Sequence, residues 1–462
     1  MSMREMRGRA ELRLVLAALA LVLVAACSGL VPPEPAGGAH STPATAVGPP
    51  EYRALWVDAF HEGIHSRAEI DRLIITAQRA RLNALFVQVR KAGDAYYSKS
   101  LEPRAWDIFA PASFDPLAYL LSRAHAASPR LEVHAWANTF YVGRRSRVFY
   151  EHGAEWGNRT YSGGTGAYLD PGNGAAREYT LQVLLKLASS YDLDGLHLDF
   201  VRYPEGGDWG YSPDAVAAFD AAAGRTGTPD PADEAWKQWR RDQVTALVRD
   251  LYRELSRRRP HVKLSAALIP WGAGPADEAG WRQTAAHDQV FQDWSAWLKE
   301  GILDLAVPMN YDTAWAPRPA RWFEQWIEWE KDNQAKRRVV IGVGAYLNYP
   351  EDTLAQIRRA LAPSARGNRA AGVAIYSYAS TSLYGTDDYY RDPEAAATLP
   401  RQPYAEGLDG PGLAQRAQRF NAQFWTLLTT SGSYTDPAQG RVDTQPVFTR
   451  PAPVPQLPWR RA

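Results

Sequence analysis

An aspartate and a histidine share one face of the stretch 194–204, which reads DGLHLDFVRYP, and this spacing could support chemistry. Successive side chains of a strand point to opposite faces, so His197 and Asp199 lie together. The other face is apolar and is formed by Leu196, Leu198 and Phe200. Because an apolar strand face packs against helices, we expect His197 and Asp199 to point inward. Arg202 or Arg90 could keep Asp199 ionised, and Asp199 could then act as a nucleophile or base.

Polar and charged groups recur at the ends of at least five candidate strands. They are Trp56 and Asp58; Gln88 and Arg90 with the following Asp94; His134, Trp136 and Asn138; Asn310, Tyr311 and Asp312; and Tyr376 and Tyr378. A barrel filled only for stability would present mostly Val, Ile and Leu there. A buried polar group without a partner costs roughly 1–3 kcal/mol. Any one of these groups could be structural, but their recurrence favours a functional site.

Alternating strands and helices must position these groups. Strand patterns cover residues 53–60, 84–90, 131–139, 195–203, 262–270, 302–311, 338–346 and 372–379. Helix patterns cover residues 68–81, 116–127, 175–191, 233–258, 288–299, 320–335 and 353–361. These eight steps predict an α/β fold, a (β/α)8 TIM barrel over residues 51–384 with enlarged βα loops and a C-terminal extension at 385–462. The competing open sheet would carry a glycine-rich phosphate turn, and the sequence has none.

The first 50 residues do not read as part of this fold. Basic residues precede an apolar run at 14–26 that is short for a membrane span, and the run ends in Val-Ala-Ala-Cys at Cys27. This order is typical of a lipoprotein signal peptide with a lipobox at 1–27, with Cys27 as the lipid attachment site. Plain secretion is the alternative. Residues 28–50 read as a flexible linker. We therefore expect a lipid-anchored protein of the cell envelope that faces the periplasm or the exterior.

Composition excludes some partners and hints at others. The chain is 45% hydrophobic and 22% charged with a net charge of +1, which predicts no nucleic-acid partner. Its long predicted loops are rich in aromatic residues, which could either form a groove for an extended ligand or anchor the loops. They are Tyr96, Tyr97, Trp106, Tyr141, Trp156, Tyr161, Tyr168, Trp209, Tyr211, Trp271 and Trp281.

The strand-end motifs resemble those of the glycosyl hydrolase-like family 10. The resemblance rests on 56–58 (WVD), 88–90 (QVR) with 93–97 (GDAYY), 134–138 (HAWAN), 169–173 (LDPGN) and 197–204 (HLDFVRYP), in this order. It implies a (β/α)8 barrel of the bacterial envelope, and some members cut peptidoglycan glycan strands stripped of their peptides. It also implies that Asp199 cleaves the sugar chain with Arg90, Asp94, Asn138 and Arg202 around it. We expect Asp58, Trp136, His197 and Tyr311 to complete the substrate site.

The second carboxyl group that glycoside hydrolysis usually needs is less evident. The motif around Asp199 is also similar to those of glycoside hydrolase families 13 and 18. Here Val201 stands where family 18 has its acid, and the fifth strand ends in 269–271 (IPW) without the acid of family 13. We rank Asp312 first as the partner of Asp199, followed by Asp94, Asp58 and Glu62.

Other chemistries have less support. His134, His197 and Asp199 form a conceivable two-histidine, one-carboxylate metal site, but the usual His-x-His run is missing, so we expect no metal or other cofactor. There is no Gly-x-Ser-x-Gly motif and Cys27 is in the leader, so a Ser or Cys nucleophile is not expected. The sequence predicts a glycoside hydrolase acting on a glycan, and the alternative is a non-catalytic glycan-binding lipoprotein with a degenerate barrel.

Overall fold

Eight parallel strands close into a barrel in the computed structural model, which describes residues 47–108, 110–385, 399, 401 and 410–460. Around the barrel the order is β1, β2, β3, β6, β7, β8, β9, β10 and back to β1. The strands are β1 (Tyr52–Val57), β2 (Ala84–Arg90), β3 (Glu132–Asn138), β6 (Gly195–Asp199), β7 (Lys263–Leu268), β8 (Leu305–Asn310), β9 (Arg338–Gly344) and β10 (Gly372–Tyr376). The predicted (β/α)8 barrel is therefore confirmed, and each predicted strand segment overlaps one of these strands.

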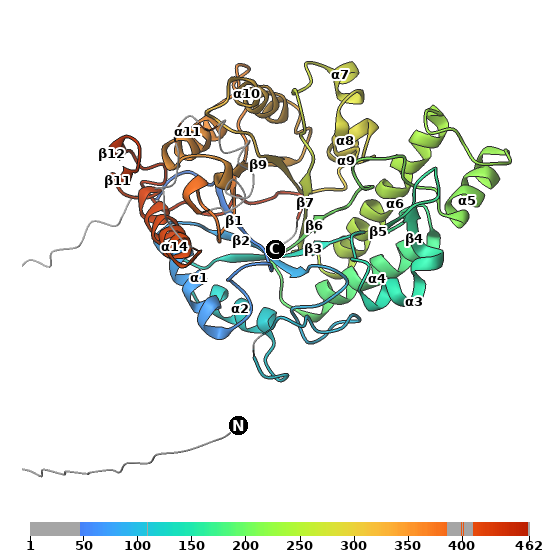
Figure 1. Cartoon of the computed structure of the whole chain (residues 1–462), viewed down its shortest axis with the longest axis horizontal. Helices are drawn as coiled ribbons and strands as arrows, with labels where there is room; N and C mark the ends of the chain where they lie inside the picture. The colour runs from blue at the N-terminus through green and yellow to red at the C-terminus, as the bar shows by residue number, and fades with distance from the viewer. Residues whose placement is uncertain (1–46, 109, 386–398, 400, 402–409, 461–462) are drawn as a thin grey trace, which may run out of the picture. The chain divides into compact units, whose positions relative to one another are not determined.

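Helices surround the strands, as Figure 1 shows. The main ones are α1 (Arg67–Arg79), α2 (Pro116–His125), α4 (Gly174–Ser190), α6 (Glu234–Arg258), α9 (Trp294–Glu300), α10 (Pro317–Asp332) and α11 (Pro350–Leu361). Side-chain caps start several of them; for example, Ser66 accepts a hydrogen bond from the Glu69 N–H at the start of α1. The helix predicted at 288–299 is wrong in its first part. The chain has φ +53° at Phe291, and α9 begins only after Asp293, which caps it.

Two apolar layers hold the barrel together. Leu196 and Leu198 of β6 belong to the layer between strands and helices, as their period-two pattern predicts. His197 points to the opposite, inner side, where Trp56, Phe86 and Trp136 surround it. The strand ends at Asp199, four residues before the predicted end at 203, because Phe200 takes φ +48°. Phe200 therefore leaves the strand and packs against Tyr141 and Tyr168 instead of continuing the helix-facing row.

The long βα loops contain structure that the sequence patterns did not predict. The connection from β3 to β6 holds α3 (Arg147–Trp156) and a hairpin of β4 (Gly157–Arg159) and β5 (Thr165–Leu169) before α4. The connection from β6 to β7 holds α5 (Pro213–Ala223), whose Phe219 packs on Trp236 of α6. The connection from β7 to β8 holds the short helices α7 (Glu278–Arg282) and α8 (Ala285–Asp288).

The C-terminal segment closes the end of the barrel where the strands begin. After α14 (Gly410–Leu427) and a hairpin of β11 (Gly432–Asp436) and β12 (Gly440–Thr444), the chain runs across this end. The Trp459 indole N–H and the Arg460 guanidinium both donate to Asp304, which directly precedes β8, at 2.6 and 2.7 Å. The site must therefore lie at the opposite end, where the strands finish.

Membrane attachment concerns residues outside this description. No helix within residues 47–460, as far as they are described, is long and apolar enough to cross a bilayer. The predicted signal peptide, Cys27 and all but the last four residues of the predicted linker lie outside the described residues.

Candidate functional site

Asp199 lies at the C-terminal end of β6, beside Asn138 at the end of β3. The two residues are register partners in the parallel pair, so both sit at the same end of the barrel, as predicted from their strands. Asp199 Oδ1 accepts a hydrogen bond from the Phe200 N–H at 2.6 Å and lies 3.3 Å from Arg202 Nη1. The side chain is nearly buried, with 5% of the residue exposed. A carboxylate is thus held at the mouth by a turn that immediately follows its own strand.

Two opposing influences set the protonation of Asp199. Burial raises the pKa of the Asp199 carboxyl, while Arg202, the Phe200 N–H and the Trp136 indole act in the other direction. The Trp136 indole N–H thus serves Asp199, whereas the Arg202 Nε is buried and has no hydrogen-bond partner among the described residues. Because buried donors are normally satisfied, the Arg202 Nε–H is available for a ligand oxygen close to Asp199.

Asp312 follows β8 and carries an unusual carboxyl group. Burial alone raises its pKa to about 7. Its backbone oxygen accepts from Asn348 Nδ2 and Gln356 Nε2 at 3.1 and 2.9 Å, so the main chain is fixed. In the described part of the chain its carboxyl group has no hydrogen bond or ion pair. A carboxyl of this kind keeps its proton near neutral pH and can give it to a bound group.

An aromatic cluster surrounds Tyr311, the residue that precedes Asp312. Tyr311 packs on Tyr376 of β10 with ring centroids 5.1 Å apart and meets Tyr346 and Trp56 edge-on at 6.0 Å each. Burial raises the pKa of Tyr311 well above its ordinary value, and the charge of Asp199 adds to this effect. Tyr311 therefore lies within the electrostatic reach of Asp199 and is followed directly by Asp312.

His197 belongs to a deeper layer than Asp199. Its Nε2 accepts from the Trp56 indole N–H at 2.9 Å, and its Nδ1 lies 2.9 Å from Ser265 Oγ. An accepting Nε2 requires the proton on Nδ1, so the ring is neutral and donates to Ser265. Burial holds the pKa of His197 well below its ordinary value. The ring is fully buried and stacks on Phe86, so its bonds are made within the barrel interior.

Arg90 points away from the barrel interior because of a β-bulge. The register between β2 and β3 shifts between Gln88 and Arg90, so these two residues do not share a face as their spacing predicted. Arg90 is fully buried and binds Glu102 through two hydrogen bonds of 2.6 and 2.7 Å. Tyr179 of α4 donates to the same Glu102. The sequence patterns did not indicate Glu102, because it lies in a loop 12 positions after Arg90, where no strand alternation marks it.

Hydrogen bonds to main-chain groups after β2 hold the side chains of Asn138 and Asp94. Asn138 Nδ2 donates to the Lys91 carbonyl at 2.6 Å, and its Oδ1 accepts from Gln88 Nε2 at 3.1 Å. Asp94 Oδ1 accepts from the N–H groups of Lys91 and Ala92 at 2.9 and 2.8 Å. Both side chains therefore shape the turn after β2, at the rim of the mouth.

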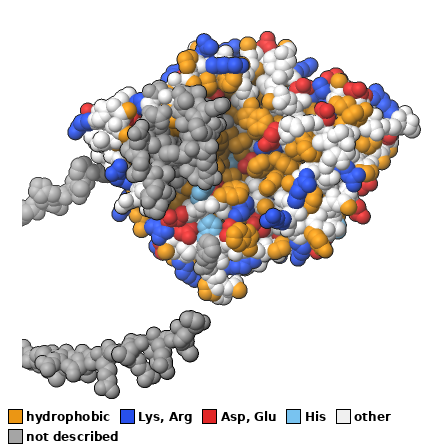
Figure 2. Space-filling model, viewed as in Figure 1, with side chains coloured by type: hydrophobic (Ala, Val, Ile, Leu, Met, Phe, Trp, Pro, Cys, Tyr) orange, Lys and Arg blue, Asp and Glu red, His pale blue; other side chains and the backbone are white. Residues whose placement is uncertain are grey.

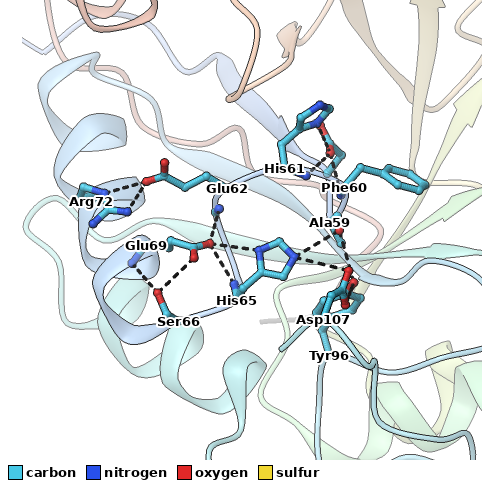
Figure 3. A network of polar contacts seen from close by, with 12 residues as sticks. Ala59, Phe60, His61, Glu62, His65, Ser66, Glu69, Arg72, Tyr96 and Asp107 are labelled. Atoms are coloured by element: carbon cyan, nitrogen blue, oxygen red, sulfur yellow. Dashed lines mark hydrogen bonds and ion pairs between the residues drawn. The ribbon is translucent and has the colours of Figure 1, made fainter. Parts of the chain in front are cut away.

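Asp58 and its neighbours form a polar network after β1, which Figure 3 shows in part. Asp58 Oδ1 accepts from His61 Nδ1 at 2.7 Å, while its buried Oδ2 has no partner among the described residues. In Figure 3 the His65 ring lies between Glu69 and Asp107. Glu62 pairs instead with Arg72 of α1 and is half exposed. The network ties the loop after β1 to the loop after β2.

The two histidines of the conceivable metal site, His134 and His197, have other partners. His134 Nε2 lies 3.2 Å from Glu132 Oε2, near the start of β3 and away from the mouth. Among the described residues there is no cluster of three or more His, Cys, Asp or Glu side chains that could hold a metal ion.

The loop aromatics divide into buried, half-buried and exposed side chains, and the half-buried ones are Tyr141, Trp156 and Trp209. Tyr96, Tyr97, Tyr168, Tyr211 and Trp281 are buried and anchor the loops. Trp106 is 86% exposed and Trp271 40% exposed, and Tyr161 and Phe60 are also exposed. Arg202 lies over the Trp271 ring at 6.0 Å, which brings Trp271 close to Asp199. Figure 2 shows hydrophobic side chains gathered across the middle of the face in view, among charged ones. Exposed rings among charges suit a sugar, which presents both apolar and hydroxyl faces.

Comparison with known sequences adds to this geometry. The family model described as glycosyl hydrolase-like 10 matches residues 51–351. Glycosyl hydrolase YngK of Bacillus subtilis (strain 168) is 24% identical over 299 residues, which cover 56% of this chain and 54% of that protein. Glycosyl hydrolase DigH of Escherichia coli (strain K12) is 24% identical over 312 residues, which cover 61% of this chain and 66% of that protein. The matches span less than two thirds of the length of these relatives.

Solved structures share the fold at low sequence identity. The glycoside hydrolase domain of PgaB (BpsB) from Bordetella bronchiseptica has a TM-score of 0.52 and 16% identity, covering 76% of this chain and 98% of that chain. The cold-adapted beta-galactosidase from Rahnella sp. R3 has a TM-score of 0.52 and 13% identity, covering 83% of this chain and 56% of that chain. At such identities the similarity concerns the barrel fold alone.

Proposed function

We propose that this chain, which belongs to the glycosyl hydrolase-like 10 family, hydrolyses glycosidic bonds in peptidoglycan glycan strands whose peptides have been removed. Family membership supports a glycan hydrolase. The choice of peptidoglycan rests on the resemblance of the strand-end motifs and on the predicted lipid anchor at Cys27. The activity and substrate of the whole protein are part of this proposal, because the similarity covers only part of each relative.

The observation that carries the catalytic part is a pair of carboxyl groups in different environments. Asp199 has a cation and a backbone donor on one oxygen, whereas Asp312 has neither among the residues that the structure describes and has a pKa of about 7. Two carboxyl groups set apart in this way divide the acid and base roles of glycoside hydrolysis. Asp199 is thus the candidate nucleophile or base, and Asp312 the candidate acid.

The bond changes follow from these roles. The Asp312 carboxyl gives its proton to the glycosidic oxygen as the bond to the anomeric carbon breaks. Asp199 either attacks that carbon or takes a proton from a water that attacks it. In the first case a glycosyl ester forms on Asp199, and water then cleaves this ester while the Asp312 carboxylate takes the proton of the water. The positive charge that develops on the sugar ring is stabilised by the Asp199 carboxylate. The unpartnered Nε–H of Arg202 would meanwhile hold a hydroxyl oxygen of the bound sugar.

The exposed aromatic rings support a substrate longer than one sugar. Trp271 lies beside Arg202, while Trp106 and Tyr161 are carried by other loops at the mouth. Flat rings of this kind bind the apolar faces of successive sugars. We place the protein, as a lipoprotein, in the cell envelope, where such a polymer is found.

The deciding experiment compares two forms of one polymer. Purified protein is incubated with peptidoglycan sacculi before and after amidase treatment, and soluble oligosaccharides are measured. We expect release from the amidase-treated strands only. Binding to those strands without any release would instead support the glycan-binding alternative, and release from intact sacculi would contradict the requirement for peptide-free strands.

A further inference from the structure

A buried carboxyl group and a buried amide meet behind the end of β8. Glu330 of α10 and Asn310 of β8 are 0% and 1% exposed. Asn310 Nδ2 donates to Glu330 Oε2 at 3.0 Å. Two further atoms of the same pair, Asn310 Oδ1 and Glu330 Oε1, are buried and have no hydrogen-bond partner among the described residues. Both of these atoms are acceptors when Glu330 is ionised, so neither can satisfy the other.

A single proton on Glu330 would give both unsatisfied atoms a hydrogen bond. If Glu330 Oε1 carries a hydrogen, it becomes a donor, and its natural acceptor is Asn310 Oδ1, the unsatisfied oxygen of the amide that already bonds Glu330 Oε2. The acid and the amide then exchange two hydrogen bonds in a closed ring, and no net charge is buried. Leaving a carboxylate there would instead combine an unpaired charge with two unsatisfied polar atoms, which is strongly unfavourable in a protein interior.

We propose that Glu330 carries a proton in the folded protein and forms with Asn310 a neutral, doubly hydrogen-bonded pair that positions Tyr311 and Asp312 at the barrel mouth. Asn310 directly precedes these two residues, so the pair anchors the end of β8 to α10. Glu330 is a positioning residue, because it acts through Asn310 and not on the substrate. This last part rests on the proposed function, since it takes Asp312 as the acid.

The charges around Glu330 are compatible with a neutral state. Burial raises the pKa of Glu330 well above its ordinary value, and the charge of Asp312 acts in the same direction. Lys331 on the same helix acts in the opposite direction. The Lys331 ammonium, however, has partners of its own, since it donates to the Arg359 carbonyl at 2.9 Å and lies 4.0 Å from Glu328.

The test compares the unfolding of the wild type and Glu330→Gln across pH. Glutamine keeps the shape and both hydrogen bonds of the proposed ring but cannot lose a proton. A carboxyl whose folded pKa is raised stabilises the protein only while protonated, so this contribution is lost as pH rises from the unfolded pKa of about 4.3. We expect the folding equilibrium constant of Glu330→Gln, divided by that of the wild type, to rise by up to about tenfold per pH unit above pH 5.

Controls and a second measurement keep the test decisive. Glu328→Gln, on the same helix with a partly exposed carboxylate, should not show this rising ratio. A ratio for Glu330→Gln that is flat between about pH 5 and pH 8 would overturn the proposal. If Glu330→Gln does not fold, carbon-13 NMR of wild-type protein labelled at the glutamate carboxyl decides. One glutamate resonance should remain in its neutral position at pH 7, and its absence would also overturn the proposal.

Activity measurements on Glu330 variants test the positioning role separately from the protonation state of Glu330. Glu330→Gln should keep glycan hydrolysis within about threefold of wild type near neutral pH, whereas Glu330→Ala should lose most of it while still folded. Equal losses in the two variants would overturn the positioning role. If the wild type itself does not hydrolyse glycan, the proposed function fails, while the unfolding and NMR results still decide whether Glu330 is neutral.

Discussion

The Arg202 guanidinium lies 3.3 Å from the Asp199 carboxylate, and both side chains are nearly buried at the mouth of the barrel. A close cation lowers the pKa of a carboxyl group and so opposes the effect of burial on Asp199. If Asp199 is the nucleophile or base, it works only when ionised. Activity should then be present above its pKa and be lost as pH falls through it.

Removing the cation should move this acid limit. In Arg202→Met the pKa of Asp199 rises further, so the acidic limb of kcat/KM is expected to shift upward by about one pH unit or more. Arg202→Lys keeps a positive charge and serves as the matched control, with a smaller shift. The pH profiles of the three proteins on peptide-free strands give the answer. An unmoved acidic limb in Arg202→Met would show that Asp199 is not the group that titrates there.

Asp199→Asn should abolish most activity with little effect on stability. Asparagine is nearly isosteric and can still accept from the Phe200 N–H, but it removes the charge that faces the transition state. We expect a loss on the order of 10³-fold, which corresponds to about 4 kcal/mol of transition-state stabilisation. Asp192→Asn, before the start of the same strand and exposed, is the control. More than about a tenth of wild-type activity in Asp199→Asn would assign Asp199 a structural role.

Asp312 should set the alkaline limit of activity. A general acid acts while protonated, so activity should be present below its pKa of about 7 and be lost as pH rises through that value. In Asp312→Asn the alkaline limb is expected to disappear together with most turnover, and a substrate with a good leaving group should restore part of the rate. Glu62→Gln, in a half-exposed pair with Arg72, should behave like wild type. A retained alkaline limb in Asp312→Asn would point to another acid.

The C-terminal segment should matter for stability and not for chemistry. Arg460→Ala leaves the buried Asp304 with an uncompensated charge, which is expected to lower the free energy of unfolding by about 3–5 kcal/mol. Turnover by the folded protein should stay unchanged, because Asp304 lies at the end of the barrel opposite the mouth. Arg441→Ala, in an exposed pair with Asp443, is the control for urea unfolding. Equal unfolding midpoints for both variants would contradict this role for Arg460.

Cys27 should determine where the protein is found in the cell. The sequence predicts a lipid on this residue, so Cys27→Ala is expected to move the protein from the membrane fraction to the soluble periplasmic or medium fraction. Ser28→Ala leaves the cysteine in place and should remain with the membranes. The measurement is fractionation followed by immunoblotting. An unchanged distribution of Cys27→Ala would show that attachment does not depend on this residue.

Local patterns in the sequence were enough to predict the barrel. Alternation along each strand depends only on residues two positions apart, so Leu198 could be assigned to the helix side and Asp199 to the inside without knowledge of the fold. Eight repeats of strand and helix then leave few ways of closing a sheet. The same local logic placed Asn138 and Asp199 at one end of the barrel, where their register pairs them.

Only the tertiary structure decided which polar groups face the mouth and in which protonation state. One bulge in β2 turns Arg90 outward to Glu102, and no alternation pattern contains that shift. His197 bonds to Trp56 and Ser265, which lie 141 and 68 residues away from it in the chain. Only the closure of the barrel brings these residues together. The pKa of Asp312 depends on how much water the packed chain removes from around it, and the spacing of residues along a sequence does not encode that quantity.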